Sequence, residues 1–110
     1  MKLYFYILDR TYEGDFSLRC EECEVIEKPK SYVPVYHWPV GVCAARINKS
    51  VVGGFTSQYD DIVVLYAKDH KKARELFFKR YYAAIQTLKY QLEKFNAMKE
   101  AVENFEEKKW

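Results

Sequence analysis

Basic side chains gather where a long C-terminal helix is expected to begin, and they form the first candidate for chemistry. His70, Lys71 and Lys72 follow Asp69, and Arg74 lies about one turn further on. Cations in a first helical turn oppose the helix dipole. Free backbone N–H groups combined with basic side chains suit a phosphate group. We therefore expect Lys71, Lys72 and Arg74 to bind phosphate; the alternative is a solvated basic face that pairs with carboxylates.

An aromatic stretch punctuated by prolines, residues 28–40, supplies the second candidate. Tyr36 and Trp38 are rings that can stack on a nucleobase, and Arg46 follows them as a further phosphate ligand. Asn48, Lys49 and the segment 53–56, which holds two glycines and Thr56, complete this set. The alternative is that the rings cover an edge of the core or contact a protein partner.

Three cysteines and one histidine have the spacing of zinc ligands. Cys20 and Cys23 form a C-x2-C motif, and His37 and Cys43 follow in the order C-x13-H-x5-C. Such a site requires a hairpin at Glu21–Glu22 that brings the first two thiols together. Free cysteine is often just a small buried residue, so we expect no cofactor, with zinc as the alternative.

Catalytic motifs are absent from the sequence. It contains no G-x-S-x-G motif, no Walker loop and no H-E-x-x-H motif, and neither histidine stands beside a nucleophile motif. Paired carboxylates such as Asp60–Asp61 are typical of turns. We expect a binding protein and not an enzyme.

Short strands must position these candidates. Apolar, aromatic and β-branched runs predict strands at residues 3–8, 16–20, 23–27, 42–47, 51–52 and 62–67. The three prolines exclude a central strand from residues 28–40, because proline lacks a ladder donor. The predicted fold is α+β, with five or six mainly antiparallel strands in residues 1–68 and one long helix in residues 69–110 of the same single domain.

The helix is expected to be long and to need a partner. Residues 69–109 contain neither glycine nor proline, and Asp69 is placed to cap the helix. Apolar residues follow a heptad pattern, with Phe78, Ile85 and Leu92 at a and with Tyr81, Leu88, Phe95 and Val102 at d. A rod of about 60 Å outruns a strand of about 20 Å. We expect a homodimer or higher oligomer; the alternative is a break near Asn96 that folds the tail back.

Composition limits the class of protein. The chain has 110 residues, 31% of them charged, and a formal net charge of +2, which is too mild to indicate nucleic-acid binding by itself. Ten tyrosines suit a small core that merges into a binding surface. No apolar run approaches the length of a membrane span, and the N-terminus lacks a signal-cleavage pattern. We expect a cytoplasmic protein with no membrane partner.

This organisation resembles small accessory proteins of phages and prophages. The stretches that carry the resemblance are 20–32, 46–50 and 67–77. One such family, the anti-Thoeris sponge proteins, sequesters cyclic nucleotide signals of bacterial immunity in pockets at oligomer interfaces. Another class, the anti-CRISPR inhibitors, binds a nuclease complex directly. The resemblance implies an anti-defence protein in a bacterial host, with a nucleotide signal or a host defence protein as its target.

Overall fold

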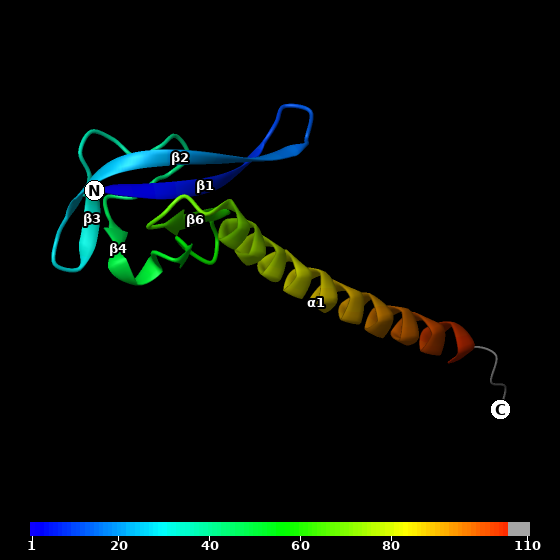
Figure 1. Cartoon of the computed structure of the whole chain (residues 1–110). Coiled ribbons are helices and arrows are strands. Elements are labelled where there is room, and N and C mark those ends of the chain that lie inside the picture. The colour runs from blue at the N-terminus through cyan, green and yellow to red at the C-terminus, as the bar shows by residue number, and fades with distance from the viewer. Residues whose placement is uncertain (106–110) are drawn as a thin grey trace. The chain divides into compact units, whose positions relative to one another are not determined.

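A computed structural model describes residues 1–105, and the chain divides into one unit, Met1–Leu76, and a second unit that begins at Phe77. The first unit is built on a long antiparallel hairpin of strands β1 (Lys2–Arg10) and β2 (Phe16–Glu27), shown in Figure 1. The turn between them closes where the Thr11 amide donates to the carbonyl of Asp15 over 2.7 Å. Gly14 adopts a φ of 89° there, which favours glycine.

Four short strands extend the hairpin into a six-stranded antiparallel sheet of order β4-β3-β2-β1-β6-β5. They are β3 (Ser31–Pro34), β4 (Ile47–Asn48), β5 (Gly54–Phe55) and β6 (Ile62–Leu65), with a 3-10 turn, η1 (Lys49–Val51), between β4 and β5. Helix α1 (His70–Phe105) follows. The fold is α+β with a sheet followed by one long helix, as predicted.

The core lies mainly on one face of the sheet. Residues alternate between faces along a strand, so Leu3, Phe5 and Ile7 of β1 share a face with Ile62 and Val64 of β6. All five are buried, and the segment 38–52 covers them with partly buried side chains: Trp38, Val42, Val51 and Val52. The loop that carries Arg46 is therefore part of the cover of the core.

The opposite face of the sheet receives the start of α1. Tyr6 lies on this face, and its hydroxyl oxygen is 2.8 Å from Nδ1 of His70, the first residue of the helix. Ala73, one turn on, is fully buried. The Asp69 carboxylate accepts a 3.0 Å hydrogen bond from the backbone amide of Lys72, which confirms Asp69 as the helix cap.

The predicted turn at Glu21–Glu22 is wrong. Residues 16–27 form one continuous strand, and Glu21 and Glu22 lie opposite Phe5 and Tyr4 of β1. The turn in this part of the chain joins β1 to β2 at residues 11–15, where Gly14 supplies the backbone freedom that a Glu-Glu pair lacks. The long pairing with β1 outweighs the low strand preference of the glutamates.

Two other strand predictions need correction. Residues 31–34 form an internal strand between β2 and β4, although the prolines were expected to exclude one; Pro34 ends it, so the missing donor falls at the end of the ladder. Of the strand expected at 42–47, only Ile47 is in a strand, and residues 51–52 are not in one. The apolar side chains Val42, Val51 and Val52 pack on the core from a loop and a turn, so their hydrophobicity reflects burial and not strand pairing.

The second unit, within the described residues 77–105, is a single stretch of α1. The helix is continuous through Asn96, so the alternative of a break that folds the tail back is wrong. The expected helical residues beyond 105 lie outside the described part of the chain. Among residues 1–105, no helix combines the length and the apolar character needed to cross a membrane.

Candidate functional site

A polar cavity of about 220 Å³ in the first unit is the best candidate for a ligand site. It lies between segment 42–51 and segment 56–62. Its lining residues are Val42, Cys43, Ala44, Arg46, Ile47, Asn48, Val51, Thr56, Asp60 and Ile62. The structure thus brings together three residues of the second sequence candidate, Arg46, Asn48 and Thr56, around one cavity, which we call the Arg46 cavity.

Two anchors fix the loop that carries Arg46. On one side, the ring of Trp38 packs edge-on against Phe5, with 5.6 Å between the ring centroids, and its indole N–H donates a 2.7 Å hydrogen bond to the carbonyl of Ala44. On the other side, Ile47 is buried in the core. Arg46 therefore stands on a short loop that is held at both ends.

Thr56 contributes a buried polar group that has no hydrogen-bond partner among residues 1–105. Its backbone amide donates a 2.9 Å hydrogen bond to the carbonyl of Ile62, which holds the residue against β6. Its side-chain oxygen is buried and makes no hydrogen bond within the described structure. Burying an unpaired hydroxyl costs roughly 1–3 kcal/mol of stability. Thr56 is among the residues that line the cavity, and a hydroxyl without a partner is stabilised when a ligand or a water pairs with it.

Opposite charges meet in the Arg46 cavity. The Arg46 guanidinium offers a planar set of donors that matches a phosphate. Asp60 also lines the cavity, and its backbone amide donates a 3.1 Å hydrogen bond to the hydroxyl of Ser57. A carboxylate repels a bare anion but accepts hydrogen bonds from hydroxyl or amino groups. The cavity therefore suits a ligand that carries both a phosphate and neutral donors.

The other predicted phosphate ligands lie elsewhere. Arg74 lines a second cavity, of about 390 Å³, together with Tyr6, Cys20 and His70. Lys71 and Lys72 are exposed and line neither this cavity nor the Arg46 cavity. The structure therefore does not gather Arg46 and the three cations of α1 around one cavity.

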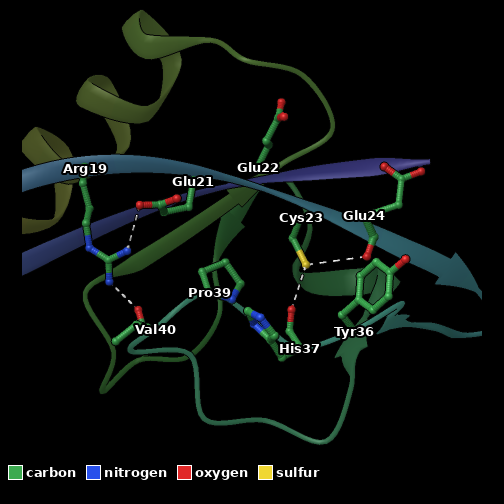
Figure 2. Close-up of a pocket in the computed structure, with 9 residues that line it drawn as sticks. All are labelled: Arg19, Glu21, Glu22, Cys23, Glu24, Tyr36, His37, Pro39 and Val40. Carbon is green, nitrogen blue, oxygen red and sulfur yellow. Dashed lines mark hydrogen bonds and ion pairs between the residues drawn. The ribbon is translucent and has the colours of Figure 1, made fainter.

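The two predicted stacking rings are also separated from Arg46. Tyr36 is 89% exposed and lines a third cavity, of about 340 Å³, which also includes Glu21, Glu22 and Glu24 (Figure 2). Three carboxylates make that cavity a poor place for a phosphate. Trp38 lines neither cavity; its ring covers the core and positions the Arg46 loop.

Contacts of Arg19 link the strand and the loop that line the third cavity. The Arg19 guanidinium pairs with Asp9 and Glu21 and donates to the carbonyl of Val40, as Figure 2 shows in part. The hydrogen bond with Asp9 is the main reason why the pKa of Arg19 is raised. These contacts tie β2 to the loop that carries Tyr36.

The predicted zinc ligands do not converge. Cys20 and Cys23 are three residues apart in the continuous strand β2, so their side chains point to opposite faces of the sheet. Cys23 is buried, its thiol contacts the carbonyl of His37 at 3.5 Å, and burial raises its pKa. Cys43 lines the Arg46 cavity instead. Within residues 1–105, no three His, Cys, Asp or Glu side chains gather as they would around a metal.

The sequence did not place Asp60 at this cavity and did not single out the Thr56 hydroxyl. Asp60–Asp61 was interpreted as a turn or as carboxylates that pair with the basic face of the helix, and Thr56 only as part of a segment with two glycines. A usable signal was present, because Asp60 lies just before β6, the most hydrophobic run of the chain, and Thr56 directly follows β5. Polar residues next to short strands are well placed to line a site.

Comparison with known proteins adds no likeness from which a function could be transferred. No protein-family model, curated protein or solved structure matches the chain.

Proposed function

We propose that this chain is a non-enzymatic, oligomeric binding protein of the phage anti-defence type, which sequesters a cyclic nucleotide immune signal in the bacterial cytoplasm. The observation that carries the proposal is the Arg46 cavity, a polar hollow lined by Arg46, Asp60 and Thr56, whose hydroxyl makes no hydrogen bond within residues 1–105. The exposed apolar side chains of α1 support the oligomeric part of the proposal.

Three residues of the Arg46 cavity would each contact a different group of the ligand. Arg46 binds a phosphate through paired N–H donors. The hydroxyl of Thr56 gains its missing partner from a phosphate or ribose oxygen. Asp60 accepts a hydrogen bond from a ribose hydroxyl or an exocyclic amine, which favours a nucleotide over inorganic phosphate. A cavity of about 220 Å³ lies below the usual size of a small-molecule site, so it encloses a phosphate and its ribose while the base remains outside.

Calorimetric titration with a panel of cyclic mononucleotides and cyclic dinucleotides tests the proposal. We expect at least one of them to bind, and we expect Arg46→Gln to weaken its binding at least ~10-fold. Inorganic phosphate alone should bind much more weakly, because it lacks the ribose hydroxyls and the exocyclic amine that would donate to Asp60. Lys68→Gln, which removes an exposed cation outside the cavity, is the matched control and should bind as the wild type does.

The outcomes also separate the two predicted phosphate sites. Loss of binding in Lys71→Gln or Lys72→Gln, with Arg46→Gln unchanged, would move the site to the start of α1. Absence of heat with every nucleotide of the panel would overturn the sequestering function.

A protein-binding inhibitor, such as an anti-CRISPR that blocks a nuclease complex, is the second candidate. Tyr36 and Val40 are 89% and 82% exposed beside the three carboxylates of the third cavity. An aromatic and an aliphatic anchor next to acidic groups suit a partner whose surface is basic, as the surfaces of nucleic-acid-binding proteins are. Under this alternative, Tyr36→Ala abolishes inhibition of a nuclease complex in a cleavage assay, whereas Arg46→Gln has no effect.

A further inference from the structure

An exposed apolar stripe runs along the second unit. Ile85, Leu88, Leu92, Phe95 and Val102 recur at spacings of three, four and seven residues on α1, and all are exposed. Leu88 and Phe95 have exposed fractions of 64% and 60%. Within residues 77–105 this unit is one helix, which has no core of its own to cover these side chains. The spacing is that of a coiled-coil seam.

Charge is distributed unevenly along the same helix. Residues 77–91 carry only cations, namely Lys79, Arg80 and Lys89. The three carboxylates of the described unit, Glu93, Glu100 and Glu103, all lie in residues 92–105, where only two lysines accompany them. One of those lysines, Lys99, is 3.6 Å from the carboxylate of Glu103 in the same helix. The helix is therefore basic in its first half and slightly acidic in its second.

We infer that two copies of the chain pair antiparallel along residues 77–105 of α1. This inference rests on the oligomeric part of the proposed function and adds the orientation of the two copies. In an antiparallel pair the basic first half of one helix lies along the acidic second half of the other. A parallel pair in register places the two cationic halves side by side.

The seam residue Lys99 favours the same orientation. It occupies an a position of the heptad, so a parallel pair in register sets the two Lys99 side chains against each other within the seam. In an antiparallel pair each Lys99 faces a residue from the first half of the other helix. The helix dipoles also favour this orientation, because the positive end of each helix then lies beside the negative end of the other.

The surface available is sufficient for a stable pair. Five large side chains from each copy, at roughly 100 Å² each, cover about 1,000 Å² in total, which reaches the lower limit of a specific interface. Because residue 77 follows the first unit directly, the two sheet units then join opposite ends of a helix pair about 40 Å long. Each sheet unit consequently keeps its own Arg46 cavity.

Disulfide trapping in the full chain tests the orientation. Three preparations are oxidised mildly: Val102→Cys alone, Ile85→Cys mixed with Phe95→Cys, and Ile85→Cys mixed with Val102→Cys. We expect one of the mixed preparations to form a cross-linked dimer between the introduced residues and Val102→Cys alone to form none. Peptide mapping distinguishes these links from any made by the three natural cysteines, and the wild-type chain gives the background.

The outcomes separate this inference from the proposed function. The antiparallel arrangement would be overturned if most Val102→Cys dimers were linked to each other through residue 102. It would also be overturned if the chain formed a dimer but neither mixed preparation gave a link between its introduced cysteines. Neither result would affect the proposed nucleotide site. A chain that shows the mass of one copy at every concentration in native mass spectrometry would overturn both this inference and the oligomeric part of the function. Retained nucleotide binding in Ile85→Cys would show that the sheet unit of the variant folds.

Discussion

The indole N–H of Trp38 donates a 2.7 Å hydrogen bond to the backbone carbonyl of Ala44, two residues before Arg46. The same indole ring packs edge-on against the buried ring of Phe5. A side chain anchored in the core thus holds the loop that carries the guanidinium of the proposed site. This relationship gives Trp38 a structural role in positioning the Arg46 loop, which its ring and its proline-rich setting did not suggest.

Trp38→Phe should weaken both the fold and the site. The phenyl ring retains most of the packing on Phe5 but lacks the N–H that bonds to Ala44. We expect a loss of about 1 kcal/mol in the free energy of unfolding, measured by urea denaturation, together with weaker nucleotide binding in calorimetry. Tyr36→Phe, at an exposed position, is the control and should change neither quantity. Unchanged binding in Trp38→Phe would show that the loop does not need this anchor.

Thr56→Val should change stability and binding in opposite directions. Valine matches threonine in shape but removes the buried hydroxyl, which makes no hydrogen bond within the described part of the chain. We expect the ligand-free protein to gain about 1 kcal/mol in the free energy of unfolding, while the affinity for a nucleotide falls. Urea denaturation and calorimetry of the same variant measure the two effects. A less stable Thr56→Val would mean that a water already pairs with the hydroxyl.

The sequence indicated the fold class because its strongest signals are local. The aromatic and branched run of β1, the apolar run of β6 and the absence of glycine and proline after Asp69 each reflect one element. The error at Glu21–Glu22 arose because two adjacent glutamates disfavour a strand locally, whereas pairing with Tyr4 and Phe5 is a long-range interaction. Segment 42–46 is apolar because it covers the core, and periodicity alone cannot distinguish such a loop from a strand.

Alkaline pH should destabilise the protein through two buried tyrosines. Burial raises the pKa of Tyr6 to about 12, and the hydrogen bond with the hydroxyl of Tyr66 raises the pKa of Tyr32 to about 12. An unfolded tyrosine has a pKa of about 10. Both folded-state pKa values lie above this unfolded value. The stability that the two protonated hydroxyls contribute is therefore fully present below pH about 10 and is lost as the pH rises to about 12.

Urea midpoints measured from pH about 8 to about 12 test this dependence. Tyr32→Phe and Tyr6→Phe should each flatten the decline above pH about 10, because each removes one of the shifted groups. Tyr12→Phe, at a fully exposed ring, should leave the profile as it is. An identical decline in all variants would contradict the assignment of the alkaline transition to these two hydroxyls.

The three cysteines should react with an alkylating reagent at different rates. Cys43 is exposed and should be modified first, whereas Cys23 is buried and its raised pKa lowers the thiolate fraction. Peptide mass spectrometry over time measures the order. Mild oxidation should not link Cys20 to Cys23, because they lie on opposite faces of β2. A rapid Cys20–Cys23 disulfide would contradict the continuous strand.

The candidate site was predictable only in part. Arg46, Asn48 and Thr56 were grouped from their residue types, and the structure places them around one cavity. Tyr36 was grouped with them because it is near Arg46 in sequence, yet it lines the acidic cavity of β2. The path of the loop between the two residues depends on the packing of Trp38 against Phe5, and a tertiary contact of this kind leaves no local signal in the sequence.

Native mass spectrometry of the full chain, titrated with cyclic nucleotides, tests the central claim most directly. We predict a particle of two chains that gains the mass of a nucleotide, and we predict that Arg46→Gln keeps the two-chain mass but loses the added ligand. A particle with the mass of one chain, or a two-chain particle to which no nucleotide of the panel adds, would contradict the account.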